Sequence, residues 1–430
     1  MRVLQQADSE LRKHLRSQKI CPGTKYKPSQ YVLRFTHAGR RFLFHTLTRE
    51  LLEADLPECY LPGQGWDSFI ENYYLVPAEI DECAFYQEIS SLMRSSRKEK
   101  MHRLYTILPT TVCNARCTYC YENGIKPETM TPETVRHTIQ YIRNTQSGNK
   151  VRIKWAGGEP LLCVGIIDQI CEGLREAGLE YSSSMLSNGS LIKPETVRKM
   201  QEDWNLKRIQ ISMDGAETDY IARKQYPAAV DPYHVVMEGI NLLAESGIQV
   251  IVRCNVDEEN WNGISAFLSD MKTAISDKTN VWVYFAPLFQ VRSGNHDLAL
   301  WEKVLAAKPA IEEAGFHAKS SIFSDSRFRI FHCMADGGNV AINSDGGLYA
   351  CACLAQSSRF GNVLNGITDE DARLSFCSVD RIREKCRKCP FLPECTAFDS
   401  CPYNDTHCRD VREMEALAAL KDIVKTEMMA

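Results

Sequence analysis

The sequence of 430 residues lacks features that would assign it to several large classes of proteins. No stretch approaches the ~18 consecutive apolar residues that a membrane-spanning helix needs. The first twenty residues are charged throughout and contain no apolar core of a secretion signal. Lys and Arg (51) do not exceed Asp and Glu (55), so the basic excess typical of a nucleic-acid-binding surface is missing. These absences predict a cytoplasmic protein whose partners are neither membranes nor nucleic acids.

Internal repeats and low-complexity tracts are also missing from the sequence. The composition, 44% hydrophobic and 25% charged, is that of a folded globular protein. A chain of this length exceeds one ordinary hydrophobic core, so we expect about two or three domains.

Cysteine, in contrast, is abundant, with 18 residues. In a long chain without an export signal, metal or redox chemistry explains such a content better than disulfides do. A first group comprises Cys113, Cys117 and Cys120. A second group is Cys333, Cys351, Cys353, Cys377, Cys386, Cys389, Cys395, Cys401 and Cys408. The isolated cysteines, which we interpret as small buried apolar side chains, are Cys21, Cys59, Cys83, Cys163, Cys171 and Cys254.

The pattern of the first 95 residues predicts a small α+β unit. Residues 30–47 indicate a hairpin of two short strands around a Gly-containing turn. Helical periodicity follows at 48–54, 66–74 and 79–94. Residues 94–100 are charged and indicate a solvated linker.

A different rhythm begins near residue 102. Strand-like runs occur at 103–108, 151–156, 183–187, 207–212, 248–256 and 281–287. Helical stretches lie between them, and several begin with a capping residue and a proline, as Thr131 and Pro132 do. This alternation predicts parallel βαβ units in an incomplete barrel or an open doubly wound sheet. Both architectures place their sites at the carboxyl ends of the strands.

The first two strands both end in residues suited to chemistry. The triad Cys113-x3-Cys117-x2-Cys120 follows the first strand, although zinc and ordinary iron–sulfur sites need four ligands. The second strand ends in Gly157-Gly158-Glu159, where the glycines permit a ligand to approach the backbone and the carboxylate can pair with a cation. A structural zinc site completed by a distant Cys or His is the alternative.

These motifs resemble those of the radical S-adenosylmethionine (radical SAM) superfamily, including the aromatic residue, Tyr119, before the last cysteine. The resemblance implies that the triad holds three irons of a four-iron, four-sulfur cluster, and that the fourth iron takes the amino and carboxylate groups of S-adenosylmethionine. It implies cofactor contacts for the glycine-rich motif and for two later strand ends, and a carboxylate-binding role for an arginine. These residues are Gly157, Gly158, Glu159, Ser187, Asn188, Ser212, Asp214 and Arg223. No catalytic side chain is indicated.

The C-terminal cysteines resemble the SPASM extension of radical SAM enzymes, which carries two auxiliary four-iron clusters. The resemblance assigns Cys333, Cys351 and Cys401 to the first cluster. It assigns Cys386, Cys389, Cys395 and Cys408 to the second. One departure is the spacing before Cys401, where five residues replace the usual three. Cys353 therefore competes with Cys401, or the first auxiliary cluster keeps an open iron for a substrate thiolate.

Together these patterns predict a partial (β/α)6 TIM barrel flanked by two smaller domains. Residues 1–95 resemble a winged-helix-like element that recognises leader peptides, 96–300 form the barrel, 301–332 a bridging region and 333–430 the SPASM domain. The combination resembles peptide maturases that form thioether crosslinks in ribosomal precursor peptides. It implies S-adenosylmethionine, three four-iron clusters, a precursor peptide with a leader, and flavodoxin or ferredoxin as electron donor.

Several alternatives share these motifs. A carbon–carbon crosslinking maturase, a peptide epimerase or an anaerobic sulfatase-type maturase is compatible with the same cysteines. A multi-cluster electron carrier or a zinc-structured scaffold is the non-enzymatic alternative, and it leaves the strand-end motifs unexplained. Iron rather than zinc in anaerobically purified protein separates the two classes.

Overall fold

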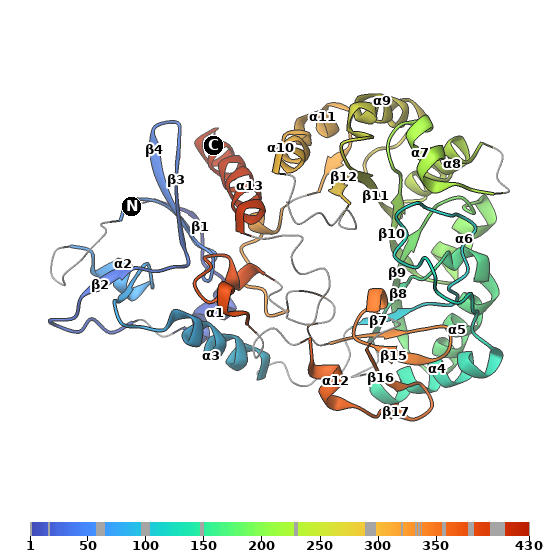
Figure 1. The fold of residues 1–430 in the computed structure, drawn as a ribbon, viewed down its shortest axis with the longest axis horizontal. Helices are drawn as coiled ribbons and strands as arrows, with labels where there is room; N and C mark the ends of the chain where they lie inside the picture. Colours follow the sequence, from blue (N-terminus) through green and yellow to red (C-terminus); the bar gives the residue numbers. More distant parts are fainter. Residues whose placement is uncertain are drawn as a thin grey trace. The chain divides into compact units, whose positions relative to one another are not determined.

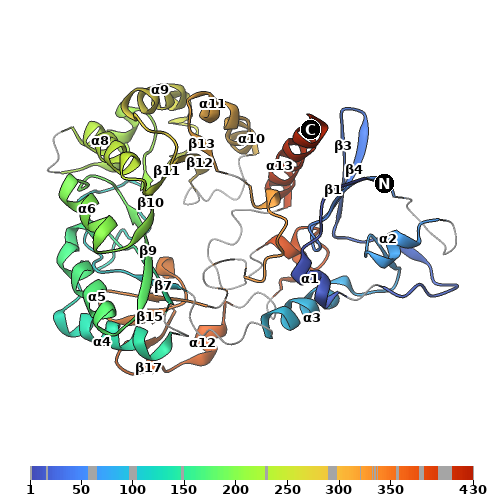
Figure 2. The same ribbon diagram turned by 180° about the vertical axis from the view of Figure 1, so that it is seen from behind.

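The computed structural model describes residues 2–15, 18–56, 65–95, 104–146, 150–227, 231–288, 298–319, 321–331, 333, 336, 338–354, 358–376, 382–395 and 409–429. The chain divides into two compact units (Figures 1 and 2). The terminal unit comprises Met1–Lys98, Ser320–Cys333 and Phe376–Ala430. The barrel unit comprises Glu99–Lys319 and Met334–Ser375.

The barrel unit is built on parallel strands, as the sequence predicts. Their order in the sheet is β13-β12-β11-β10-β9-β8-β7. The strands are β7 (Leu104–Ile107), β8 (Lys150–Trp155), β9 (Glu180–Ser187), β10 (Leu206–Ser212), β11 (Gln249–Val256), β12 (Val281–Pro287) and β13 (His317–Ala318). All six strands expected from the sequence are present, and the partial barrel is confirmed.

Helices alternate with these strands and lie along one face of the sheet (Figure 1). They are α4 (Pro132–Thr145), α5 (Val164–Glu176), α6 (Pro194–Glu202), α7 (Glu217–Lys224), α8 (Pro232–Glu245), α9 (Ile264–Ala274), α10 (Leu298–Ala306) and α11 (Lys308–Glu313), with the short turns η1 (Pro160–Cys163) and η2 (Trp261–Gly263). The predicted start of α4 is confirmed, because Thr131 Oγ1 accepts a hydrogen bond from Thr134 N at 3.1 Å and Pro132 follows as the first helical residue.

The sheet continues beyond β7 with a C-terminal segment. The added elements are β14 (Asn339–Ile342), β15 (Gly347–Tyr349), η4 (Ala352–Leu354), β16 (Arg359–Asn362), β17 (Gly366–Ile367) and α12 (Glu370–Leu374). Strand β14 pairs in parallel with β7, placing Ile342 opposite Ile107. Residues 334–375 therefore belong to the barrel unit. The physical reason is that β7 offers an unpaired edge that an apolar strand can cover.

The terminal unit contains the sheet β1-β5-β4-β3 and a separate pair, β2-β6. Its elements are β1 (Arg2–Gln5), α1 (Ser9–His14), β2 (Tyr26–Pro28), β3 (Val32–His37), β4 (Arg40–His45), β5 (Leu51–Glu53), α2 (Asp67–Glu71), β6 (Leu75–Pro77), α3 (Glu82–Ser95), η3 (Ile322–Ser324), η5 (Glu384–Cys386), η6 (Leu392–Glu394) and α13 (Arg409–Met429). The predicted hairpin is confirmed, with Ala38 and Gly39 at positive φ in its turn.

One helix expected in this unit is wrong. Residues 48–54 contain strand β5 instead of a helix. Leu51 packs with Phe44 and Leu420 on one face of the sheet, whereas Leu52 packs with Phe69 and Tyr74 on the other. Adjacent leucines that bury on opposite faces require the two-residue period of a strand.

The core of the terminal unit combines three separate segments of the chain. One apolar cluster joins Phe35 of β3, Phe323 of η3, Leu420 of α13 and, just before η6, Phe391. A second joins Leu11, Tyr86 of α3, Phe328 and Leu392. The first 95 residues therefore share their core with the C-terminal segment, which sequence patterns do not indicate.

Among the isolated cysteines, Cys83, Cys171 and Cys254 are buried as expected. Cys163 is only half-buried, and Cys21 is exposed, so its prediction is wrong. Cys59 and Cys377 lie outside the described residues. No helix within the described part of the chain is both long and apolar enough to cross a bilayer.

Candidate active site

The Cys113–Cys120 loop lies directly after β7, and the end of α7 holds it in place. Arg116 N donates to the carbonyl oxygens of Lys224 at 2.9 Å and Gln225 at 3.1 Å. Thr118 N donates to Arg223 O at 3.0 Å. These backbone bonds fix the loop between strand and helix, so the three thiols occupy defined positions.

The glycine-rich motif after β8 supports the residues that precede this loop. Gly158 N donates to Thr110 O at 3.0 Å, and Glu159 N donates to Val112 O at 2.9 Å. A Cβ atom on Gly157 would lie 2.4 Å from Thr110 O, and one on Gly158 would lie 2.2 Å from Val112 O. The glycines are therefore needed for close approach to the chain's own backbone, where the sequence led us to expect approach to a ligand.

Glu159 links the ends of β8 and β9. Its carboxylate accepts hydrogen bonds from Asn188 N at 2.7 Å, Ser187 Oγ at 2.9 Å and Leu161 N at 3.1 Å. Burial raises the pKa of Glu159, and these hydrogen bonds oppose the shift. Asn188 Nδ2 donates to Asn114 Oδ1 at 2.8 Å. The strand-end residues predicted as cofactor contacts thus lie together and order the cysteine loop.

Asp214, after β10, is the centre of a buried polar network. It accepts a hydrogen bond from the Tyr119 hydroxyl and another from Asn255 Nδ2 at 2.9 Å. Lys224 Nζ lies 3.4 Å from Asp214 Oδ2 and donates to Ser212 Oγ at 2.7 Å. Burial lowers the pKa of Lys224, but the anionic neighbour Asp214 raises it, and the net pKa lies well above its ordinary value. The network ties Tyr119, inside the cysteine motif, to the ends of two strands.

Within the chain, Arg223 has acidic partners. Its guanidinium pairs with Asp257 and lies 3.6 Å from Glu259. Lys224, the next residue, faces Ser212 and Asp214 instead. Sequence reasoning missed Lys224, Asn255 and Asp257. The signal that could have found the last two is their position at the end of the predicted strand 248–256, where a parallel sheet keeps its chemistry.

The chemistry of the triad fits a metal cluster. Burial raises the pKa values of the Cys113, Cys117 and Cys120 thiols. Thiols in such surroundings become thiolates when a cation compensates their charge, and metal binding releases their protons. The three side chains form no disulfide and share one short loop, so the donor set is that of a thiolate-ligated site.

The C-terminal cysteines fall in both units. In the terminal unit, Cys386, Cys389 and Cys395 lie on one loop, in which Cys389 N donates to Cys386 O at 3.0 Å. In the barrel unit, Cys351 immediately precedes η4 and Cys353 lies within it. Cys333 belongs to the terminal unit and is half-buried. Cys401 and Cys408 lie outside the described residues.

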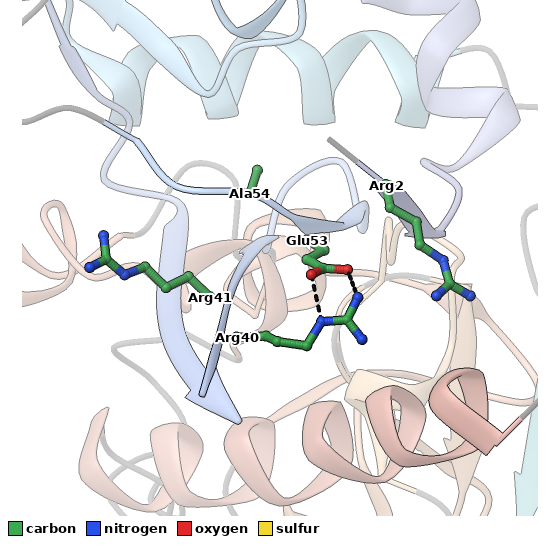
Figure 3. Close-up of a pocket in the computed structure, with 5 residues that line it drawn as sticks. All are labelled: Arg2, Arg40, Arg41, Glu53 and Ala54. Carbon is green, nitrogen blue, oxygen red and sulfur yellow. Dashed lines mark hydrogen bonds and ion pairs between the residues drawn. The ribbon is translucent and has the colours of Figure 1, made fainter. Parts of the chain in front are cut away.

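A hollow on the sheet of the terminal unit is lined by Arg2, Arg40, Arg41, Glu53 and Ala54 (Figure 3). Arg40 Nε donates to Glu53 Oε1 at 2.6 Å. Arg41 pairs with Asp55, and Arg2 lies 3.7 Å from Glu427. Because each arginine has an acidic partner, the hollow does not offer the net positive charge that an anionic cofactor requires.

Residues 107–271, which contain the cysteine loop and the ends of β8 to β11, match the family described as the radical SAM superfamily. Residues 107–271 therefore form a radical SAM domain, and the chain is an enzyme whose cofactors are S-adenosylmethionine and a four-iron cluster.

Solved structures resemble the chain over most of its length. Native anSMEcpe with bound AdoMet is 15% identical, with a TM-score of 0.58, and the match covers 75% of this chain and 99% of that chain. Streptococcus suis SuiB bound to the precursor peptide SuiA is 15% identical, with a TM-score of 0.52, covering 88% and 96%. At these identities the likeness shows a shared fold.

A sequence relative is an uncharacterized protein of Methanocaldococcus jannaschii. It is 25% identical over 273 residues, which are 59% of this chain and 86% of the relative.

Proposed function

We propose that this radical SAM enzyme modifies a ribosomally made precursor peptide by joining a peptide cysteine sulfur to a peptide carbon. The observation that carries the proposal is the Cys113–Cys120 loop, fixed at the end of β7 by α7 and by the glycine-rich strand end. Similar folds bound to peptides support a peptide substrate, namely SuiB with SuiA and anSMEcpe with the Cp18Cys peptide.

In this proposal Cys113, Cys117 and Cys120 hold the cluster that binds S-adenosylmethionine. When bound, the cofactor supplies a 5′-deoxyadenosyl radical that takes a hydrogen atom from the substrate. The chain's own residues position the site: Glu159 fixes the end of β9, and Asp214 with Lys224 fixes Tyr119. The contacts assigned from the resemblance to Gly157, Gly158, Ser187, Asn188, Ser212 and Arg223 remain part of the proposal.

Forming the thioether breaks one C–H and one S–H bond and makes one C–S bond, so two hydrogen atoms must leave. The first leaves as the hydrogen atom that 5′-deoxyadenosine carries away. The second leaves as a proton and an electron, and the electron needs an acceptor. We propose the C-terminal cysteines as ligands of two auxiliary clusters, which would supply an electron acceptor when bound. Cys386, Cys389 and Cys395 already share one loop, and Cys353 stands beside Cys351 as a candidate to complete the first cluster.

Strand β3 is the proposed docking edge for the peptide. Because Ala38 and Gly39 form a two-residue turn, Arg34 and Thr36 fall at non-hydrogen-bonded positions opposite β4. Their N–H and C=O groups therefore point away from β4, and both side chains are exposed. Among the described residues, neither amide has a backbone partner outside the hairpin. An extended leader peptide can pair with such an edge.

The remaining features follow from this reaction. A flavodoxin or ferredoxin is the proposed electron donor, since cluster reduction needs a low potential. The cytoplasm, where such donors are kept reduced, is the proposed location.

The test uses the anaerobically purified enzyme with reductant, S-adenosylmethionine and peptides encoded beside its gene. A thioether removes two hydrogen atoms from the peptide and protects one cysteine from alkylation. A carbon–carbon crosslink removes two hydrogens but leaves that cysteine reactive, and an epimerase leaves the mass unchanged. Absence of 5′-deoxyadenosine formation with any peptide, from protein that holds its iron, would favour the electron carrier.

A further inference from the structure

Arg49 lies in the turn between β4 and β5 of the terminal unit and is fully buried. Its backbone has a φ of 68°, a left-handed conformation that is uncommon for a residue with a side chain. A buried arginine held in this conformation indicates that surrounding contacts fix the residue. Its side chain shows what those contacts are.

The guanidinium of Arg49 joins three segments of the terminal unit. Nη1 donates to Glu394 Oε1 at 2.5 Å, Nη2 donates to Ile322 O at 2.6 Å, and Nε donates to Asp325 O at 2.9 Å. The group also lies over two aromatic rings, 5.2 Å from the centroid of Phe44 and 5.8 Å from that of Phe323. Arginine suits this position, because its planar fork carries several donors and stacks on aromatic rings.

Glu394 connects Arg49 to the C-terminal cysteines. It immediately precedes Cys395, and its side chain is fully buried. Its second oxygen, Oε2, has no hydrogen-bond partner within the described part of the chain. Arg329 and Arg412 add positive charge nearby, while Arg49 makes the direct contact. Removing Arg49 would therefore leave a buried carboxylate without its hydrogen-bonded partner, which is strongly destabilising.

Two further contacts place the same loop on the N-terminal segment. Thr46 Oγ1 donates to Pro390 O at 2.6 Å, and Gln30 Nε2 donates to Arg387 O at 2.9 Å. Both donors flank the β3–β4 hairpin. The backbone of the Cys386–Cys395 loop is thus held along its length by residues more than 300 positions away in the sequence.

We propose that Arg49 is a positioning residue for the Cys386–Cys395 loop and sets the geometry in which its cysteines bind metal. The inference rests on the proposed function, in which this loop ligates an auxiliary cluster. It adds that the hairpin presenting the peptide edge and the cluster loop form one cooperative body. Metal binding to the loop then stabilises the hairpin, because a ligand that binds the ordered state favours that state.

The test compares variants of the full-length, anaerobically purified enzyme. Arg49→Met removes the charge and the fork, and Arg49→Lys keeps the charge without the fork. Arg41→Met is the matched control, since Arg41 is an exposed arginine of the same sheet. Cys386→Ala/Cys389→Ala/Cys395→Ala defines the iron and the spectroscopic signal that belong to the loop. Iron content, the electron paramagnetic resonance spectrum of the reduced protein and the melting temperature are measured without substrate.

We expect Arg49→Met to lose most of the iron defined by the triple variant and to lower the melting temperature by about 10 °C. Arg49→Lys should recover part of that iron with an altered resonance spectrum, because lysine lacks the fork. Arg41→Met should keep both readouts, with a melting temperature within about 2 °C of the wild type.

Full iron and an unchanged spectrum in Arg49→Met, even with a lower melting temperature, would overturn the inference and leave Arg49 a stabilising residue only. If Arg49→Met does not fold, a wild-type spectrum in Arg49→Lys overturns it equally. If the triple variant keeps all its iron, the auxiliary cluster of the proposed function fails as well. If the triple variant loses iron and Arg49→Met does not, this inference alone fails.

Discussion

The Cys113–Cys120 loop and the Cys386–Cys395 loop each carry three cysteines on a short segment, and they are held in different ways. The first follows β7 and is fixed by neighbouring βα units of the same sheet, through Gly158, Glu159 and Lys224. The second has little regular structure around it beyond the short turns η5 and η6. It is fixed by side chains of the N-terminal segment, above all Arg49.

This difference bears on how each site responds to damage. A loop supported by sheet neighbours depends on a few close backbone contacts, and the barrel around it has its own core. A loop supported by a distant segment depends on that segment being folded. We therefore expect the two sites to be lost independently of each other.

The largest expected effect comes from Cys113→Ala/Cys117→Ala/Cys120→Ala. Without the three thiols the cluster that binds S-adenosylmethionine has no ligands from this loop, so 5′-deoxyadenosine formation should fall below detection. The iron of the C-terminal cysteines should remain, about eight of about twelve irons if three four-iron clusters are present. Iron analysis and chromatography of the reaction mixture check both statements. Undiminished cleavage of S-adenosylmethionine would disprove the assignment of the triad.

Removal of residues 2–95 is the second prediction and acts on the other site. The deletion takes away Leu33, Phe35 and Phe44, which share an apolar cluster with Phe391 and Leu420. It also removes Arg49, so that Glu394 becomes a buried carboxylate without its ion-pair partner. We expect loss of the iron held by Cys386, Cys389 and Cys395, while the triad keeps its cluster and cleaves S-adenosylmethionine.

The outcome that contradicts this prediction is a truncated enzyme with full iron content that fails only in peptide binding. It would mean that the first 95 residues fold as an independent recognition element.

Thr36→Pro tests the docking edge with a smaller change than the deletion, because it removes one outward N–H from that edge and leaves the shared core in place. Peptide affinity should fall while iron content stays unchanged.

The sequence predicts most of the barrel because its signals are local. The structure confirms the strand runs, proline-led helix starts such as Thr131-Pro132 and the hairpin turn at Ala38-Gly39. Each of these depends on residues that are adjacent in the sequence. The cysteine spacing also indicates the radical SAM domain that residues 107–271 match. The prediction that failed concerns a segment whose structure depends on tertiary contacts. Residues 48–54 have helical periodicity, yet Leu51 and Leu52 are drawn to opposite faces of a sheet that other segments complete.

For the candidate site, too, the sequence predicts the positions of residues but not their contacts. The positions of Glu159, Ser187, Asn188 and Asp214 at strand ends follow from the alternation of strands and helices. Their hydrogen bonds to one another do not, because each partner comes from another βα unit. Lys224 and Arg223 show this limit. The two cations are adjacent at the end of α7, yet Lys224 faces Asp214 and Arg223 pairs with Asp257.

Gly158→Ala is the prediction with the smallest expected effect, and it tests the local support of the first loop. The new Cβ would lie 2.2 Å from Val112 O and 2.7 Å from Thr111 O, so the backbone preceding Cys113 must shift. Crowding of this kind costs about 1–3 kcal/mol of stability. Because the shift acts on the segment that leads into the triad, we expect slower 5′-deoxyadenosine formation with unchanged iron at Cys386, Cys389 and Cys395. The matched control is Gly165→Ala in α5, where the added Cβ has no atom within 4 Å apart from its chain neighbours and the backbone of its own helix. That substitution should leave activity unchanged and stabilise the helix by up to about 1 kcal/mol. Equal behaviour of the two variants would show that the glycine-rich strand end does not position the cysteine loop.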